Sequence, residues 1–425
     1  MQNNIFAVEG NIVNTGAQKR VRIEIDHLSG IIVKVSEPTG SADVVLKDEI
    51  IFPGFIDLHV HARECADHSQ DYKEDFHTAG EAAVNGGVVA FLEMPNNPVP
   101  PIDGASYENK KDLTKKSAVE VVLYAGIGAG TKPLQKTVPY KVFMGHSIGN
   151  LFFTSYEELD SALSKYKGEN VSFHCEDPKI LEENKDALTH GERRPNEAEV
   201  SAVNFALTLI RKHKLIGKIC HCSTIEGIEK IIQARREGVP VTVEVTPTHL
   251  FFDDSVLGGM DILKQKFMQM NPPVRNSTGD RLKLIEYLKR GDIDFLATDH
   301  APHSIEEKGK GISGLPQLDT YGPFATWLYK EHYFTIEDIQ RVCAGNPAKF
   351  INQFVKTFYG KIEEGCVGSL TVIDFDKPIT ITKEILKTKC RWSPFEGFTF
   401  PGSVAMTIVK GIPYQNGVRY GTRNL

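Results

Sequence analysis

The segment at residues 52–63, FPGFIDLHVHAR, decides the fold of this chain. On a β-strand, side chains two residues apart point to the same side, so Asp57, His59 and His61 share one face, and the apolar residues between them face the other way. Two imidazoles at one strand end make a ready chelate for zinc, which binds neutral histidine nitrogens. The alternative interpretation is a pair of hydrogen-bonded histidines in a protein core.

Seven further apolar runs follow this first strand, and helical segments separate several of them. The runs lie at residues 88–94, 119–127, 140–145, 171–175, 216–222, 241–245 and 293–299. Amphipathic helices are expected at 81–87, 196–213 and 227–238. Strands that alternate with helices indicate a parallel α/β fold, and eight strands are the number that a (β/α)8 TIM-like barrel requires.

The two ends of the chain have a different pattern from the middle. Both contain short runs in which apolar and polar residues alternate with period 2, interrupted by turn residues. We therefore expect residues 1–51 and 356–425 to form one small β-domain beside a barrel that spans residues 52–355.

Composition narrows the class of protein. Hydrophobic residues make up 41% and charged residues 24%, the balance of a soluble globular protein. The net charge of −6, without a basic stripe, argues against nucleic acid as a partner, and the absence of a long apolar run argues against a membrane span. The start has no signal-peptide pattern, and seven scattered cysteines without a CxxC pair are typical of a reduced, cytoplasmic protein.

Polar side chains interrupt or end several of the apolar runs, where an unpaired polar group is costly to bury. The carboxyl ends of barrel strands converge on one face, which is where active sites lie. Six polar groups from five strands are therefore expected to meet in a metal site. The candidate ligands are His59, His61, Lys141, His174, His221 and Asp299.

Lys141 needs a separate explanation, because an ammonium group beside two zinc ions is repelled. At an effective dielectric constant near 20, two unit charges about 4 Å apart interact by about 4 kcal/mol, and each dication doubles that. A neutral lysine amine that has captured carbon dioxide becomes a carbamate anion, whose two oxygens can bridge two metals. The alternative is a lysine that extends to solvent.

Cys220 and Cys222 flank His221 in the sequence ICHC and invite a thiolate–metal interpretation. Strand alternation puts both cysteines on the face opposite His221. We expect both thiols to pack against helices rather than to bind metal.

Several separated motifs together resemble the dihydroorotase branch of the amidohydrolase superfamily. The motif DxHxH is shared by many amidohydrolases, whereas Arg63 together with Met94-Pro95-Asn96 is more specific. The resemblance runs from about residue 50 to the C-terminus and rests on FPGFIDLHVHAR, EMPNNPVPP, YKVF, FHCED, CHCS, MNPPVR, TDHAPH and GNPAK. YKVF resembles the lysine-bridged members rather than those with a bridging aspartate. Two departures are Gln317, where the family's lid has glycine, and TPTHL in place of TPHHL.

The resemblance implies a function for each candidate residue. It implies two Zn²⁺ ions per subunit, one bound by His59 and His61 and the other by His174 and His221, with carboxylated Lys141 as the bridge. Asp299 would bind the first zinc and act as general acid and base. The carboxylate of the substrate would be held by Arg63 and Asn96, and the pocket completed by Asn271 and His303.

The implied reaction is the reversible cyclisation of N-carbamoyl-L-aspartate to L-dihydroorotate in pyrimidine (UMP) biosynthesis. Zinc lowers the pKa of bound water to about 7 and so supplies a hydroxide nucleophile, while a second zinc polarises the carbonyl. Asp299 would take the hydroxide's proton and deliver it to the leaving ring nitrogen. Two dications and three anionic groups leave the site positive, and Arg63 adds another charge, which favours an anionic substrate.

Several alternatives stay open at this point. The chain could be another cyclic amidase, an allantoinase or a hydantoinase/dihydropyrimidinase, or an inactive scaffold such as the partners of a transcarbamoylase. Arg63 could form a salt bridge at the rim, and the glycine-rich segment 306–323 could be a lid or a surface loop. The expected partner is a small-molecule substrate, and family tendency favours a homodimer.

Overall fold

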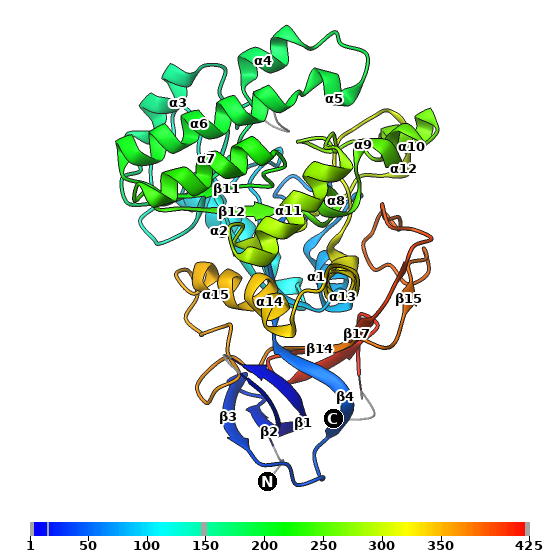
Figure 1. The fold of residues 1–425 in the computed structure, drawn as a ribbon. Coiled ribbons are helices and arrows are strands. Elements are labelled where there is room, and N and C mark those ends of the chain that lie inside the picture. Colours follow the sequence, from blue (N-terminus) through cyan, green and yellow to red (C-terminus); the bar gives the residue numbers. More distant parts are fainter. Residues whose placement is uncertain (1–3, 15–16, 146–150, 421–425) are drawn as a thin grey trace.

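The computed structural model describes residues 4–14, 17–145 and 151–420 of the chain. A layer of helices surrounds a set of central strands, and a β-domain built from the two ends of the chain lies below them (Figure 1). In the described part of the chain, no helix is long and apolar enough to cross a membrane.

The central strands form the predicted parallel barrel, and the neighbouring strands that pair within it are parallel. The third predicted run is split into two short strands, β7 and β8, around Tyr124, whose amide bonds the Glu93 carbonyl at 3.0 Å. A parallel bridge between Val60 and His300 joins the last strand back to the first. The barrel strands are β5 (Phe55–Val60), β6 (Val88–Glu93), β7 (Glu120–Leu123), β8 (Ala125–Gly126), β9 (Tyr140–Phe143), β10 (Asn170–His174), β11 (Ile216–Ile219), β12 (Val241–Val245) and β13 (Phe295–Leu296).

The predicted helices are present, and capping side chains set the starts of two of them, α1 and α7. The first begins at Phe76, before the predicted 81–87, because the Asp75 carboxylate accepts a hydrogen bond from the Thr78 amide. Thr224 caps α7 in the same way, so that this helix begins at Ile225, two residues before the predicted start. The longer helices are α1 (Phe76–Asn85), α2 (Gly104–Leu113), α3 (Tyr156–Leu163), α6 (Asn196–His213), α7 (Ile225–Arg236), α11 (Thr278–Arg290) and α13 (Tyr321–His332).

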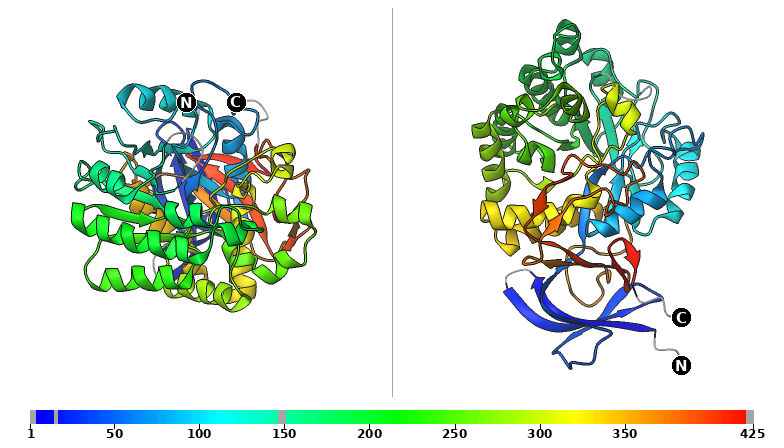
Figure 2. Two further views of the ribbon diagram at one scale, coloured as in Figure 1. Left: turned by 90° about the horizontal axis from the view of Figure 1, so that it is seen from above. Right: turned by 90° about the vertical axis from the view of Figure 1, so that its right-hand side faces the viewer.

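Short helices and turns fill the loops between these elements. They are η1 (Thr114–Lys116), α4 (Pro178–Glu183), α5 (His190–Arg193), α8 (Pro247–Phe251), α9 (Asp254–Gly258), α10 (Ile262–Phe267), α12 (Ile305–Gly309), η2 (Leu318–Thr320), α14 (Ile336–Gln340), η3 (Arg341–Gly345) and α15 (Asn346–Ile351). Seen from above, the helices ring the strands; seen from the side, the β-domain lies beneath them (Figure 2).

The two ends of the chain share one sheet, as predicted. Its strand order is β19-β18-β17-β14-β4-β1-β2-β3, and β14 from the C-terminal part pairs antiparallel with β4 from the N-terminal part. Its strands are β1 (Ile5–Asn14), β2 (Ala17–Asp26), β3 (Ile31–Ser36), β4 (Val44–Pro53), β14 (Leu370–Asp374), β17 (Ser403–Val409), β18 (Ile412–Gln415) and β19 (Val418–Arg419). A separate pair is formed by β15 (Ile379–Thr380) and β16 (Thr399–Phe400).

The junction between the two domains lies at Gly54, where β4 passes directly into β5. A Cβ atom at Gly54 would lie 2.2 Å from Val89 Cγ2, so only glycine fits this close approach. The Phe55 amide donates to the Thr371 hydroxyl at 2.8 Å and ties the barrel to the β-domain. The β-domain thus meets the amino end of β5, and the histidines lie at its other end.

Candidate metal and substrate site

Four imidazoles and one carboxylate converge at the carboxyl ends of the barrel strands. The Nε2 atoms of His59 and His61 lie 3.2 and 3.0 Å from Asp299 Oδ1. His174 Nδ1 lies 3.0 Å from His221 Nε2, and the rings of His59 and His221 are 5.1 Å apart. These residues line a cavity of about 280 Å³, together with Arg63, Asn96, Phe143, Asn271, Ala301 and residues 311–314. The structure thus brings together side chains that are far apart in sequence.

The third polar residue of the first strand, Asp57, has a structural role. Its carboxylate is fully buried and accepts hydrogen bonds from the amides of Thr298 and His59 and from the Thr298 hydroxyl. Burial raises the pKa of Asp57 to about 7. Asp57 does not line the cavity but joins β5 to the segment that follows β13.

Burial favours the neutral form of His59, His61 and His221. It holds the pKa values of His59, His61 and His221 well below the usual range, and nearby cationic groups lower them further. A neutral imidazole is the form that binds a metal ion. Burial also raises the pKa of Asp299 to about 7, although Lys141 opposes the shift.

Lys141 is fully buried inside the barrel and does not extend to solvent. Its Nζ atom donates a hydrogen bond to the Cys220 Sγ atom at 2.8 Å. The prediction that Cys220 packs against helices is therefore wrong. Strand β11 ends at Ile219 and His221 has a φ of +34°, so alternation does not continue through these residues.

Cys222 behaves as expected, because its thiol lies 3.2 Å from the Glu199 carboxylate on helix α6. Both thiols are buried, and burial raises the pKa of Cys220 to about 11.

Carboxylates behind two of the histidines were missed by the sequence analysis. Glu244 on β12 is fully buried and contacts His59 Nδ1, the His221 amide and the Lys218 ammonium. Because Glu244 occupies Nδ1, the other ring nitrogen of His59 faces Asp299. The signal was available, since Glu244 and Lys218 are charged residues inside the apolar runs VTVEV and IGKIC.

His174 has the same kind of support from a carboxylate. Its Nε2 atom lies 2.9 Å from Glu176 Oε2, and Glu176 in turn pairs with Arg194. The arginine beside it lowers the pKa of Glu176 despite its burial. Each of these two histidines therefore has one nitrogen held by a carboxylate and one directed to the cluster.

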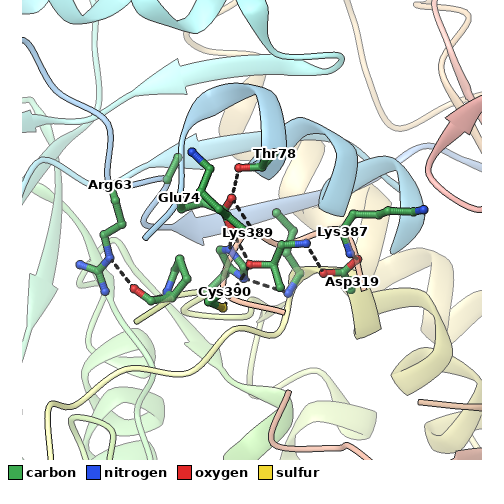
Figure 3. A network of polar contacts seen from close by, with 12 residues as sticks. Arg63, Glu74, Thr78, Asp319, Lys387, Lys389 and Cys390 are labelled. Carbon is green, nitrogen blue, oxygen red and sulfur yellow. Dashed lines mark hydrogen bonds and ion pairs between the residues drawn. The ribbon is translucent and has the colours of Figure 1, made fainter. Parts of the chain in front are cut away.

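Arg63 forms the cationic wall of the cavity, and only 1% of its surface is exposed. Its Nε atom donates to the Pro302 carbonyl at 3.2 Å, and its Nη2 atom lies 3.1 Å from His303 Nε2. Among the described residues, no carboxylate lies within salt-bridge distance of this guanidinium, so Arg63 is not a rim salt bridge. Figure 3 shows Arg63 beside the polar network around Glu74 and Asp319.

The other three predicted substrate residues differ in position. Asn96 and Asn271 line the cavity, and Asn271 Oδ1 lies 3.1 Å from His190 Nε2. His303 is fully buried, does not line the cavity and contacts the guanidinium of Arg63 from behind. Sequence analysis gave His190 no role, and no motif marks its contact with Asn271.

The segment 306–323 forms one wall of the cavity through residues 311–314. Gln317, the departure from the lid pattern, is 1% exposed and its amide group donates to the Thr298 carbonyl at 2.6 Å. Its backbone amide donates to His300 Nδ1 at 3.1 Å. The glutamine side chain therefore anchors this segment to the end of β13.

Comparisons with known proteins agree with this geometry. The chain matches the amidohydrolase family over residues 50–412. It is 34% identical to a dihydroorotase of Thermococcus kodakarensis, over 97% of this chain and 93% of that one, and 33% identical to a dihydroorotase of Pyrococcus furiosus, over 86% and 81%. Its fold is similar to that of an L-hydantoinase (dihydropyrimidinase) of Arthrobacter aurescens, with a TM-score of 0.86 and 23% identity over 97% of this chain and 96% of that one.

Proposed function

We propose that this chain, which belongs to the amidohydrolase family, is a dihydroorotase that interconverts N-carbamoyl-L-aspartate and L-dihydroorotate. The observation that carries the proposal is the buried Arg63 guanidinium, which faces a histidine-lined cavity without a carboxylate partner among the described residues. Glu93, Asp299 and Glu307 stabilise this charge only from beyond ion-pair distance, so the carboxylate of an anionic ring can form the direct ion pair that Arg63 lacks. The similarity to archaeal dihydroorotases supports the same conclusion.

The donor atoms of the cluster fit metal ions. One ligand atom each from His59, His61 and Asp299 lies within 4.8 Å of the other two. His221 Nδ1 is buried and has no hydrogen-bond partner among the described residues. Neutral imidazoles and a carboxylate are ligands that zinc prefers. We infer one zinc held by His59, His61 and Asp299 and a second held by His174 and His221.

Lys141 completes this proposed metal centre. It is fully buried close enough to His59, His61 and Asp299 to perturb their pKa values, and among the described residues it has no carboxylate partner. A carboxylated lysine in this place would give the two metal ions a shared anionic ligand. When bound, the metal ions would acidify a water molecule and polarise the ring carbonyl.

Proton transfer and substrate binding fall to the side chains that line the cavity. Asp299 is the only carboxylate among the described residues that line the cavity, so it moves the proton from the attacking water to the leaving ring nitrogen. Arg63, held in place by His303, binds the carboxylate of the substrate and fixes the ring against Asp299. Asn96 and Asn271 contribute amide groups to the same cavity.

A second candidate is a hydantoinase or allantoinase, because solved hydantoinases share this fold. The rings of those substrates carry no carboxylate to pair with Arg63. An inactive scaffold is the third candidate, although all six candidate metal ligands are present and buried, and five of them line the cavity.

The test is a side-by-side assay of the purified, zinc-loaded protein with dihydroorotate, allantoin, hydantoin and dihydrouracil. We expect kcat/KM to be about 100-fold higher for dihydroorotate than for any neutral ring, because an ion pair to Arg63 contributes about 3 kcal/mol. Turnover of only the neutral rings would refute the proposal. No turnover together with no bound zinc would favour the scaffold.

A further inference from the structure

Lys308, on the short helix α12, is a fully buried lysine that the proposed chemistry does not use, and burial lowers its pKa to about 7. An ammonium group has three N–H donors, and in Lys308 each of them reaches a backbone carbonyl. The Nζ atom lies 2.9 Å from the oxygen of Gln269, 2.6 Å from that of Ile312 and 3.0 Å from that of Gly314. Lys308 therefore has no donor left for a substrate: its three N–H groups bind backbone carbonyls, and its Nζ atom also lies 5.7 Å from the centre of the Trp392 ring.

These carbonyls belong to the loops that form one wall of the substrate cavity. Ile312 and Gly314 line the cavity directly, and Gln269 lies two residues before Asn271, which also lines it. The Gly314 amide donates to the Gln269 carbonyl at 2.9 Å, so the two loops also contact each other directly. Helix α12 packs beside α10, which precedes the Gln269 loop (Figure 1).

The loop needs a donor from outside itself because its backbone is irregular. Gly311 and Gly314 have φ values of +81° and +135°, which do not belong to a helix or strand. In the part of the chain that the structure describes, no donor other than Lys308 reaches the carbonyls of Ile312 and Gly314. A buried carbonyl without a donor is costly, so this wall depends on the ammonium group.

We propose that Lys308 is a positioning residue that holds residues 311–314 against the Gln269–Asn271 segment and so shapes the substrate-binding wall of the cavity. The proposal rests on the proposed function only for the identity of the substrate. Because Lys308 touches no candidate metal ligand, its loss acts on substrate binding and leaves the metal centre intact.

The test compares Lys308→Met, Lys308→Gln and the matched control Lys310→Met in the zinc-loaded protein. Lys310 lies two residues further along, is exposed and pairs with Glu306. For Lys308→Met we expect the KM for dihydroorotate to rise about tenfold, as loss of a buried hydrogen-bond donor predicts, with a much smaller change in kcat and an unchanged zinc content. Lys308→Gln keeps two N–H donors, so its KM should lie between those of the wild type and Lys308→Met. The KM of Lys310→Met should match that of the wild type.

Hydrogen–deuterium exchange gives a second readout that needs no turnover. Amides of residues 305–316 and 268–272 should exchange faster in Lys308→Met than in the wild type or Lys310→Met, while the barrel strands keep their protection. Unchanged exchange in these loops would overturn the proposal. So would faster exchange throughout the barrel with kcat and zinc content reduced together, because that pattern marks a general loss of structure. If the wild type does not act on dihydroorotate, the proposed function fails, and the exchange experiment still decides the role of Lys308.

Discussion

The two sides of the cavity are built on different kinds of structure. The metal side consists of side chains at the ends of β5, β10, β11 and β13, and buried carboxylates such as Glu244 and Glu176 hold two of its histidines. The substrate side consists of Arg63, Asn271 and residues 311–314, which lie on loops. The metal-side residues thus lie at the ends of the barrel strands, which form a rigid frame. The residues that select a substrate lie on loops, which can vary in sequence without altering the barrel.

Backbone strain occurs on both sides of the cavity, but the structure supports it differently on each side. His221 and Asp299, which follow β11 and β13, have φ values of +34° and +51°, and Arg63 has a φ of +65°. A non-glycine residue rarely adopts positive φ, and such residues persist where the surrounding structure holds them. On the metal side that support comes from the barrel, whereas Arg63 is held by loop contacts to Pro302 and His303.

The largest effect is expected on the metal side. Asp299→Asn removes the group that moves the proton, so kcat should fall by about 10³-fold. The measurement is steady-state kinetics, with zinc analysis to show whether the metal is retained. A variant that keeps its zinc and loses less than tenfold in kcat would show that another group carries the proton.

On the substrate side, Arg63→Met should lower kcat/KM for dihydroorotate by about 100-fold, because the carboxylate loses its ion pair. Activity on hydantoin or dihydrouracil should not fall with it, which separates recognition from chemistry. Arg211→Met, at an exposed surface pair with Glu237, is the control. An equal loss for charged and neutral rings would mean that Arg63 supports the metal side instead.

A smaller effect is expected from the carboxylate behind His59. Glu244→Gln should weaken zinc binding by about 10- to 100-fold, because the glutamine amide no longer fixes the ring nitrogen with a charge. Chelator competition measures this affinity, and Glu229→Gln, at an exposed pair with Lys283, is the control. Unchanged zinc affinity would show that Glu244 does not support zinc binding through His59.

The smallest effect on activity is expected from the β-domain, which lies at the other end of β5. Ile23 is fully buried in the separate core of that domain. Ile23→Ala should destabilise the protein by about 2–4 kcal/mol and lower its melting temperature, while kcat/KM and zinc content stay near wild type. A loss of zinc from the folded variant would show that the two regions are coupled.

The fold and the metal side could be predicted from sequence for a physical reason. A polar residue inside an apolar strand is costly to bury unless it has a partner or ligand. His59, Lys141 and His221 can therefore be recognised from the sequence alone. The same signal was present for Glu244 and Lys218, but their partners lie on neighbouring strands and spacing does not reveal them.

Other features depend on backbone geometry that spacing does not encode. Cys220 was misplaced because strand alternation stops at Ile219. The contacts of Lys308 could not be foreseen, because its partners are backbone carbonyls and no side chain type marks them. The contact of His303 with the Arg63 guanidinium was likewise not foreseen, and its predicted contact with substrate stays a prediction.

The most direct measurement is anomalous diffraction at the zinc edge from crystals of the purified protein. We expect two peaks, one within about 2.0–2.2 Å of His59, His61 and Asp299 and the other at the same distance from His174 and His221. Density for a carboxylated Lys141 should lie between them. A map without an anomalous peak at these side chains would contradict the account. The contradiction would be strongest if the same protein preparation turned over dihydroorotate.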